Sequence, residues 1–232
     1  DSLYALGYRG HIDFVDDNFI GNKRQVMEVL EAMAHWGQRH GYPFYYSTEA
    51  SINLAHEKQL LELMRANDFR YVFVGIESPD DAVLSQAHKA QNIHVEVGEA
   101  VRTLAEYGII VNGGFILGFD NENDCTAARM TELIQETGIC MAMVGTLSAL
   151  PNTQLSRRLE REGLLFPGGL VQTQASDIDQ TTSGLNFVTA RPRADILRDY
   201  AAVFKNIYHP ANYYRRVERT AASLRLAAKH HE

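Results

Sequence analysis

Five short apolar segments alternate with stretches of helical periodicity, and this alternation constrains the fold more than any other feature of the sequence. We predict strands over residues 11–15, 44–48, 71–76, 109–117 and 141–150, which are rich in β-branched, aromatic and aliphatic side chains. Helical periodicity fills the intervals, over residues 22–37, 57–66, 94–107, 122–136 and 153–162. Strand–helix units repeated at this spacing predict an α/β fold of parallel strands with right-handed crossovers.

Two architectures fit five such units, an open doubly wound sheet or a partial barrel, since a complete barrel of this class needs eight strands. Several strands are apolar almost throughout, which suggests that the sheet is covered on both faces. The pattern changes after Pro151, so we expect a barrel-like domain over residues 1–162 and a small, mainly helical appendage over residues 163–232. Within the appendage we predict loops with short strands over 163–193 and helices over 194–208 and 211–229.

The composition argues against several classes of function. The 22 Lys and Arg residues are outnumbered by 29 Asp and Glu, so the chain lacks the basic surface that binding to nucleic acid requires. No stretch approaches the roughly 18 apolar residues of a transmembrane segment, and the first residues do not resemble a signal peptide. The two cysteines, Cys125 and Cys140, are too few for a disulfide scaffold and suit a cytoplasmic location; we expect both in the core.

Acidic and polar residues stand at the ends of four predicted strands. They are Asp16, Asp17 and Asn18 after the first strand, Ser47 and Glu49 at the second, Glu77 at the third and Asp120 at the fourth. Ligands of parallel α/β folds bind at the carboxyl ends of the strands, so these side chains should line one shared face. Each acid alone could instead cap the following helix. The same position in four successive units favours a shared site.

Glycines and arginines supply weaker signals. Glycine inside a strand, as at Gly113, Gly114 and Gly118, marks a bulge, a close ligand or tight packing of a helix on the sheet. The surrounding sequence matches neither phosphate-binding glycine motif. Basic residues cluster in two predicted helices, where we expect them on solvated faces. These residues are Arg157, Arg158 and Arg161 in one helix, and Arg215, Arg216 and Arg219 in the other.

Taken in order, the strand-end sequences resemble those of radical S-adenosylmethionine (SAM) enzymes. The matching segments are residues 14–19 (FVDDNF), 75–78 (GIES) followed by Lys89, 114–120 (GFILGFD) and 150–153 (LPNT) with Leu155. More narrowly, the chain is similar to the subgroup with a cobalamin-binding domain, which includes hopanoid methylases. Residues 186–188, 207–210 and 213–216 resemble the C-terminal extension of that subgroup. One departure is Asn152, where the family usually has glycine.

The resemblance implies a partial (β/α)6 barrel whose second to sixth strands are present here. Such enzymes cleave SAM on a 4Fe-4S cluster and use the deoxyadenosyl radical to abstract a substrate hydrogen. The cluster needs three cysteine thiolates, normally in a CxxxCxxC loop, and this sequence has no such motif. We therefore expect the cluster loop and a cobalamin-binding domain to lie upstream, and this chain alone to be inactive.

The resemblance also implies roles for individual residues. Asp16, Asp17 and Asn18 would approach the SAM amino group. Glu77, with Ser47 or Glu49, would face the ribose and methionine moieties. Backbone at Gly114, Ile116 and Gly118, and at Leu150 and Pro151, would contact the adenine and its sugar. Tyr213 and Tyr214 would contact the substrate, a small molecule of lipid-like character, where the C-terminal extension closes over it.

Two other functions fit the same residues. A metal-dependent barrel lyase or hydrolase could use Asp16, Asp17, Glu49 and Glu77 as oxygen ligands. A non-catalytic module could bind a ligand at the same face. The identity of the substrate and the oligomeric state do not follow from the sequence.

Overall fold

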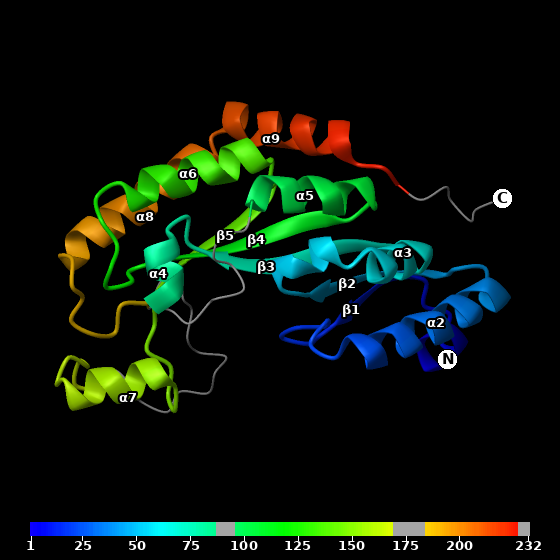
Figure 1. Ribbon diagram of the computed structural model, residues 1–232, viewed down its shortest axis with the longest axis horizontal. Helices are drawn as coiled ribbons and strands as arrows, with labels where there is room; N and C mark the ends of the chain where they lie inside the picture. The colour runs from blue at the N-terminus through cyan, green and yellow to red at the C-terminus, as the bar shows by residue number, and fades with distance from the viewer. Residues whose placement is uncertain (87–95, 169–183, 227–232) are drawn as a thin grey trace.

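The computed structural model describes residues 1–86, 96–168 and 184–226 and contains one sheet of five parallel strands (Figure 1). The strands are β1 (Gly10–Phe14), β2 (Phe44–Glu49), β3 (Phe69–Glu77), β4 (Ile110–Leu117) and β5 (Met141–Thr146). They pair in sequential order, β1-β2-β3-β4-β5, without the reversal that a doubly wound sheet requires. The fold is therefore a curled half-barrel, and the prediction of a partial barrel is confirmed.

Helices connect successive strands as the periodicity predicts. The crossovers contain α2 (Lys23–His40), then the 3-10 helix η1 (Ile52–His56) with α3 (Lys58–Ala66), then α4 (Asp81–Gln86) with α5 (Val97–Glu106), and finally α6 (Thr126–Thr137). Two elements, η1 and α4, were not predicted from the sequence, whereas the short helix α1 (Ser2–Ala5) falls within residues 1–8, which resemble the end of a helix. After β5 come α7 (Gln154–Arg161), α8 (Arg193–Ile207) and α9 (Pro210–Ser223). Lys89, residues 169–183 of the predicted loop and the end of the predicted helix 211–229 lie outside the described residues.

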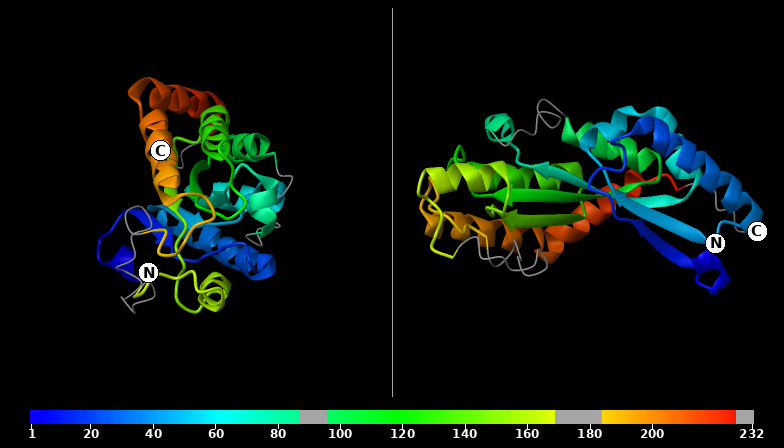
Figure 2. Two further views of the ribbon diagram at one scale, coloured as in Figure 1. Left: turned by 90° about the vertical axis from the view of Figure 1, so that its left-hand side faces the viewer. Right: turned by 90° about the horizontal axis from the view of Figure 1, so that it is seen from below.

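The hydrophobic core lies between the sheet and the helices on one of its faces. Alternate strand residues such as Val72, Val74 and Val144 point into this core and are fully buried. Residues between them point to the opposite, concave face, where Tyr71 and Met143 are exposed, Met143 by 60%. The prediction that both faces of the sheet are covered is wrong for the described part of the chain, because only the outer face carries helices. In the view from below, the strands run through the middle of the molecule (Figure 2).

The C-terminal helices share the core of the half-barrel. Ile196, Val203 and Ile207 of α8 belong to the same buried cluster as the strand residues. Helix α8 packs on α6 and β5, and α9 packs on α5 and α6. Helices α8 and α9 are thus joined to the barrel by packing, and the domain boundary at residue 163 stays a prediction.

Two predicted environments are wrong. Cys125 is exposed at the start of α6 and not in the core, while Cys140 is half-buried. Arg216, expected on a solvated face, is fully buried. Its guanidinium donates to the carbonyl oxygens of Ile139 (2.8 Å) and Cys140 (3.4 Å) and to Oε1 of Gln135 (2.9 Å). The reason is local geometry: the end of α6 and the start of β5 leave carbonyl groups that only a long, multiply donating side chain can satisfy.

Replacing Arg216 should destabilise the fold. Arg216→Met keeps most of the volume but leaves the carbonyl groups of residues 139 and 140 without their donors, which should lower the free energy of unfolding by about 3 kcal/mol. Chemical denaturation followed by circular dichroism measures this change. The neighbouring exposed arginine offers a matched control, and Arg215→Met should change stability by less than about 0.5 kcal/mol. Equal effects of the two substitutions would contradict the proposed anchoring role.

Candidate functional site

The loop that follows β1 is fastened to the end of β2. Asn18 donates its backbone N–H to Oδ1 of Asp16 (2.9 Å), and its side-chain oxygen accepts from the backbone N–H of Ser51 (3.1 Å). The backbone N–H of Phe19 donates to the carbonyl oxygen of Glu49 (2.9 Å). These bonds hold the acidic turn of residues 16–18, which is exposed, beside the carboxyl end of the neighbouring strand.

Three carboxylates converge at this corner of the sheet. The pKa of Glu49 is raised, first by partial burial and then by the negative charges of Asp17 and Asp13. Asp17 and Glu49 were expected here from the sequence, whereas Asp13 was missed. Asp13 could have been predicted, because side chains along a strand alternate between two faces and Asp13 lies on the exposed face of β1. The corner therefore attracts a positively charged group.

Ser47 lies in β2, two residues before Glu49. It is paired in register with Asp13, to which its hydroxyl donates, and its oxygen accepts from Nε2–H of His11 (2.7 Å). His11, Asp13 and Ser47 thus form a hydrogen-bonded row on the concave face. Of the three, only Ser47 was predicted from the sequence as a site residue.

Glu77 occupies a strained position at the end of β3. Its φ is +71°, in the left-handed region that residues other than glycine rarely adopt, and the pairing of β3 with β4 shifts register between Gly75 and Glu77. The side chain folds back over Gly75, where an added Cβ would lie 2.8 Å from Oε1 of Glu77. Strain at a buried strand-end carboxylate is typical of a functional position.

The strand glycines make room for side chains of the protein itself. A Cβ at Gly114 would lie 2.6 Å from Cζ of Phe73 on the concave face, and one at Gly113 would press on Phe115 and Ile139. Of the explanations considered for these glycines, close packing accounts for both positions. Ile116, which faces the same side as Gly114, is half-buried and pairs with Gly145 of β5.

The turn after β4 is organised around one buried carboxylate. Glu122 accepts the backbone N–H of Gly118 at 2.8 Å and that of Phe119. Burial raises the pKa of Glu122 to about 7, although these two backbone donors and Arg191 oppose the shift. Gly118 has a φ of +112° and lies against Leu185, so a side chain here would be both strained and obstructed. Asp120 forms an ion pair with Arg158 of α7 (2.6 Å).

The segment after β5 is held by the C-terminal part of the chain. The side-chain amide of Asn186 accepts from the backbone N–H of Ala149 (2.8 Å) and donates to its carbonyl oxygen (3.0 Å). Leu150 and Pro151 follow directly, half-buried. Asn152 has a φ of +64°, which confirms that asparagine adopts the left-handed turn where the family usually has glycine. Thr153 then caps α7.

Tyr213 and Tyr214 lie elsewhere. Tyr213 stands beside Arg216, whose partners Ile139 and Cys140 directly precede β5, so both tyrosines belong to the amino end of that strand. Tyr214 is 63% exposed. The structure does not bring either tyrosine to the carboxyl-end face.

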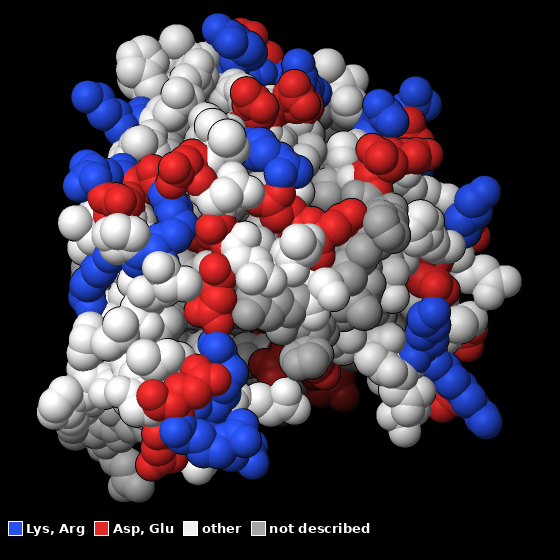
Figure 3. Space-filling model, turned by 60° about the vertical axis from the view of Figure 1, so that its left-hand side comes forward, with Lys and Arg blue, Asp and Glu red and all other residues white. Residues whose placement is uncertain are grey.

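The carboxyl-end face is hollowed. Figure 3 turns it toward the viewer and shows acidic side chains on the rim and in the depth of the hollow. Among the described residues, no group of three or more His, Cys, Asp or Glu side chains is arranged to hold a metal ion.

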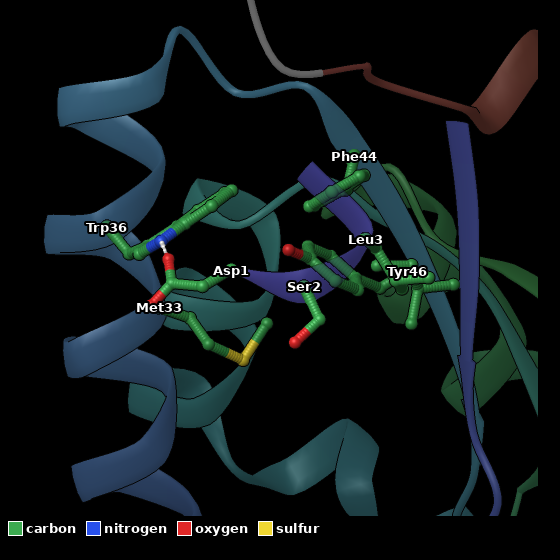
Figure 4. Close-up of a pocket in the computed structure, with 8 residues that line it drawn as sticks. Asp1, Ser2, Leu3, Met33, Trp36, Phe44 and Tyr46 are labelled. Carbon is green, nitrogen blue, oxygen red and sulfur yellow. Dashed lines mark hydrogen bonds between the residues drawn. The ribbon is translucent and has the colours of Figure 1, made fainter. Parts of the chain in front are cut away.

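A separate cavity of about 400 Å³ lies on the other face of the sheet (Figure 4). Its walls include Met33 and Trp36 of α2 and Tyr46 of β2, and Trp36 donates to Asp1 (2.6 Å). Tyr46 points away from the concave face, since it alternates with Ser47 along β2. The cavity is therefore no part of the acidic face.

Comparisons with known proteins agree with this geometry. An uncharacterized methyltransferase of Synechocystis sp. is 39% identical over 213 residues, which are 92% of this chain and 39% of that protein. The hopanoid C-2 methylase of Rhodopseudomonas palustris is 41% identical over 165 residues, 71% of this chain and 31% of the methylase. A family model described as a domain of unknown function (DUF4070) matches residues 153–232.

A solved structure shows the same fold. The radical S-adenosylmethionine methyltransferase TsrM of Kitasatospora setae, with cobalamin and a 4Fe-4S cluster bound, superimposes with a TM-score of 0.68 at 15% identity. The superposition covers 92% of this chain and 46% of TsrM. The chain is thus similar in sequence to methyltransferases, one of them a hopanoid C-2 methylase, and shares the fold of a radical SAM methyltransferase. It spans less than half the length of the two relatives. No helix in the described part of the chain is long and apolar enough to cross a membrane.

Glu122 should make stability depend on pH. Its pKa is about 7 in the folded chain against 4.5 for the ordinary group, so its stabilising contribution is complete below pH 4.5 and is lost as pH rises through 7. At pH 8 the ionised side chain should cost about 3 kcal/mol relative to the protonated one. Chemical denaturation of the wild type and of Glu122→Gln between pH 5 and 8 measures this effect. As the pH rises, the free energy of unfolding of Glu122→Gln should increase relative to that of the wild type by up to this amount. Exposed Glu160→Gln is the control, and a constant difference for Glu122→Gln across this range would refute the assignment.

Proposed function

We propose that this chain forms the SAM-binding part of a cobalamin-dependent radical SAM methyltransferase. The observation that carries the proposal is the meeting, at one edge of the half-barrel, of the acidic turn 16–18, strained Glu77 and the glycine turn after β4. In sequence, the same segments resemble the ordered motifs of the family. The identity of 41% to a hopanoid C-2 methylase over 165 residues supports a methyltransferase in particular.

Each end of SAM matches a different part of this edge. The amino group of SAM is positively charged and suits the corner of Asp16, Asp17 and Glu49. The pKa of Glu49 is raised by partial burial and, after that, by the negative charges of Asp17 and Asp13. Glu77 accepts hydrogen bonds from ribose hydroxyl groups. The backbone of Ile116 to Gly118 on one side and of Leu150 and Pro151 on the other receives the adenine ring.

The cluster does not fit the residues of this chain. Its only two cysteines are Cys125, exposed at the start of α6, and Cys140, which contacts Thr220 at the amino end of β5. A 4Fe-4S cluster that keeps one iron open for SAM needs three thiolates on one loop or cavity. We therefore assign the cluster ligands to parts of the protein outside these 232 residues, and the resemblance assigns the cobalamin site there as well.

The concave face suggests the character of the methyl acceptor. Tyr71, Met141 and Met143 expose apolar surface next to the polar row of β1 and β2. An apolar wall beside a SAM site suits a small, lipid-like substrate, in agreement with the hopanoid relative.

Removing a carboxylate from the acidic corner should weaken SAM binding. In the protein carrying its cluster, Asp17→Asn should raise the Kd for S-adenosylhomocysteine about tenfold, because one charged hydrogen bond to the amino group is lost. Isothermal titration calorimetry measures this change, with Asp195→Asn on α8 as the control. An unchanged Kd for Asp17→Asn would remove the acidic corner from the SAM site.

The isolated chain should neither bind a cluster nor turn over SAM. Anaerobic reconstitution of these 232 residues with iron and sulfide should leave no stoichiometric 4Fe-4S absorption, and SAM should bind weakly or undetectably, because the cluster iron normally chelates it. A stoichiometric cluster, or submicromolar SAM binding by the chain alone, would show that the assignment of the cluster to another part of the protein is wrong.

A further inference from the structure

The turn over residues 118–122 has an internal support that the proposed SAM site does not itself require. The side chain of Glu122 has no solvent exposure and ties down the backbone N–H groups of Gly118 and Phe119. Its own N–H donates to the carbonyl oxygen of Phe119 (3.2 Å). The conformation of the turn therefore depends on the position of one carboxylate.

The second oxygen of that carboxylate faces an arginine from the C-terminal part of the chain. Oε2 of Glu122 and Nη1 of Arg191 lie 4.0 Å apart. Both atoms are buried, and neither has a hydrogen-bond partner within the described residues. The two groups attract each other through their charges without a hydrogen bond, so the attraction depends directly on ionisation of Glu122.

Arg191 is itself held by acids. Its Nη2 donates to Oδ2 of Asp199 on α8 (2.8 Å) and to Oδ1 of Asp124 (3.1 Å), an exposed residue on the loop before α6. Among the described residues, Asp199 and Asp124 are the acidic side chains that contact Arg191. Asp120, on the same loop as Asp124, instead forms an ion pair with Arg158. Arg191 therefore links the turn after β4 to helix α8.

We propose that Glu122 and Arg191 form a latch through which the C-terminal segment sets the shape of the 118–122 turn, and with it the affinity for the adenosine part of SAM. This inference rests on the proposed function. Glu122 and Arg191 are positioning residues, because they act through the backbone of Gly118 and Phe119. The ligand would contact this turn only through its adenine ring, which would bind the backbone of Gly118 and Phe119.

Ionised Glu122 holds the turn more firmly than the protonated form. A carboxylate accepts stronger hydrogen bonds from backbone N–H groups than a carboxylic acid does, and only the carboxylate attracts Arg191. Binding of an adenosine ligand should therefore favour the ionised form and release protons near neutral pH, where Glu122 is partly protonated.

The test is calorimetric titration of the cluster-loaded protein with S-adenosylhomocysteine at pH 6, 7 and 8, in buffers of different ionisation enthalpy. The wild type should bind about fivefold more tightly at pH 8 than at pH 6 and release a fraction of a proton at pH 7. In Glu122→Gln both the pH dependence and the proton release should disappear. In Arg191→Gln the midpoint of the pH dependence should move to higher pH, because Glu122 loses its positive neighbour.

Arg198→Gln is the matched control, since Arg198 is an exposed arginine on α8 that pairs with Asp195. It should reproduce the wild-type profile. Retention of the wild-type proton release in Glu122→Gln, or an unmoved midpoint in Arg191→Gln, would overturn the latch. Arg191→Gln keeps the proposal testable if Glu122→Gln fails to fold. Failure of the wild type to bind S-adenosylhomocysteine at any pH would instead overturn the proposed function, and the latch with it.

Discussion

Parallel pairing of five consecutive strands is the constraint on which the site depends. Because every strand runs in the same direction and neighbours in sequence are neighbours in the sheet, all five carboxyl ends meet at one edge. Residues as far apart in sequence as Asp17 and Leu150 are brought to that edge. The helices return the chain to the opposite edge each time, and their burial against the outer face supplies most of the hydrophobic stabilisation.

The same geometry leaves the inner face of the half-barrel open. Helices cover only the outer face, so side chains that point inward have no partner layer among the described residues. Apolar residues there, such as Met143, would be unfavourable on a surface that remained in water, whereas they suit a face that a cofactor, a substrate or a further part of the protein covers. Polar residues occupy the β1–β2 side, and the β3–β5 side is mainly apolar apart from Asn112, so the two sides of the open face differ in chemistry.

The sequence predicted those parts of the structure that depend on periodicity and order. Strand–helix alternation predicted all five strands and the acidic edge, and the motif order indicated the superfamily. It could not predict Arg216, because whether an arginine on a helix is buried depends on carbonyl groups that α6 and β5 leave unsatisfied more than seventy residues earlier in the chain. The prediction for Cys125 was wrong in the opposite sense. Cysteine is usually buried, but Cys125 lies in the exposed turn before α6. Glu122 carried no signal either, since its importance arises from two backbone donors three and four residues away.

The C-terminal segment supports the loops that follow β4 and β5 directly. Asn186 fixes the backbone of Ala149 as a neighbouring strand would, and Leu185 closes the space above Gly118. Arg191 then reaches the turn that Glu122 organises. Thus three residues within a short stretch touch the two loops that follow β4 and β5, where the adenine would bind. A half-barrel cannot close on itself as a complete barrel does, so the loops at its last strands need support from elsewhere. The described residues after residue 184 provide that support: Leu185 and α8 join the main core, and Phe187 packs with Ala149 and Leu159 in a second, smaller hydrophobic cluster.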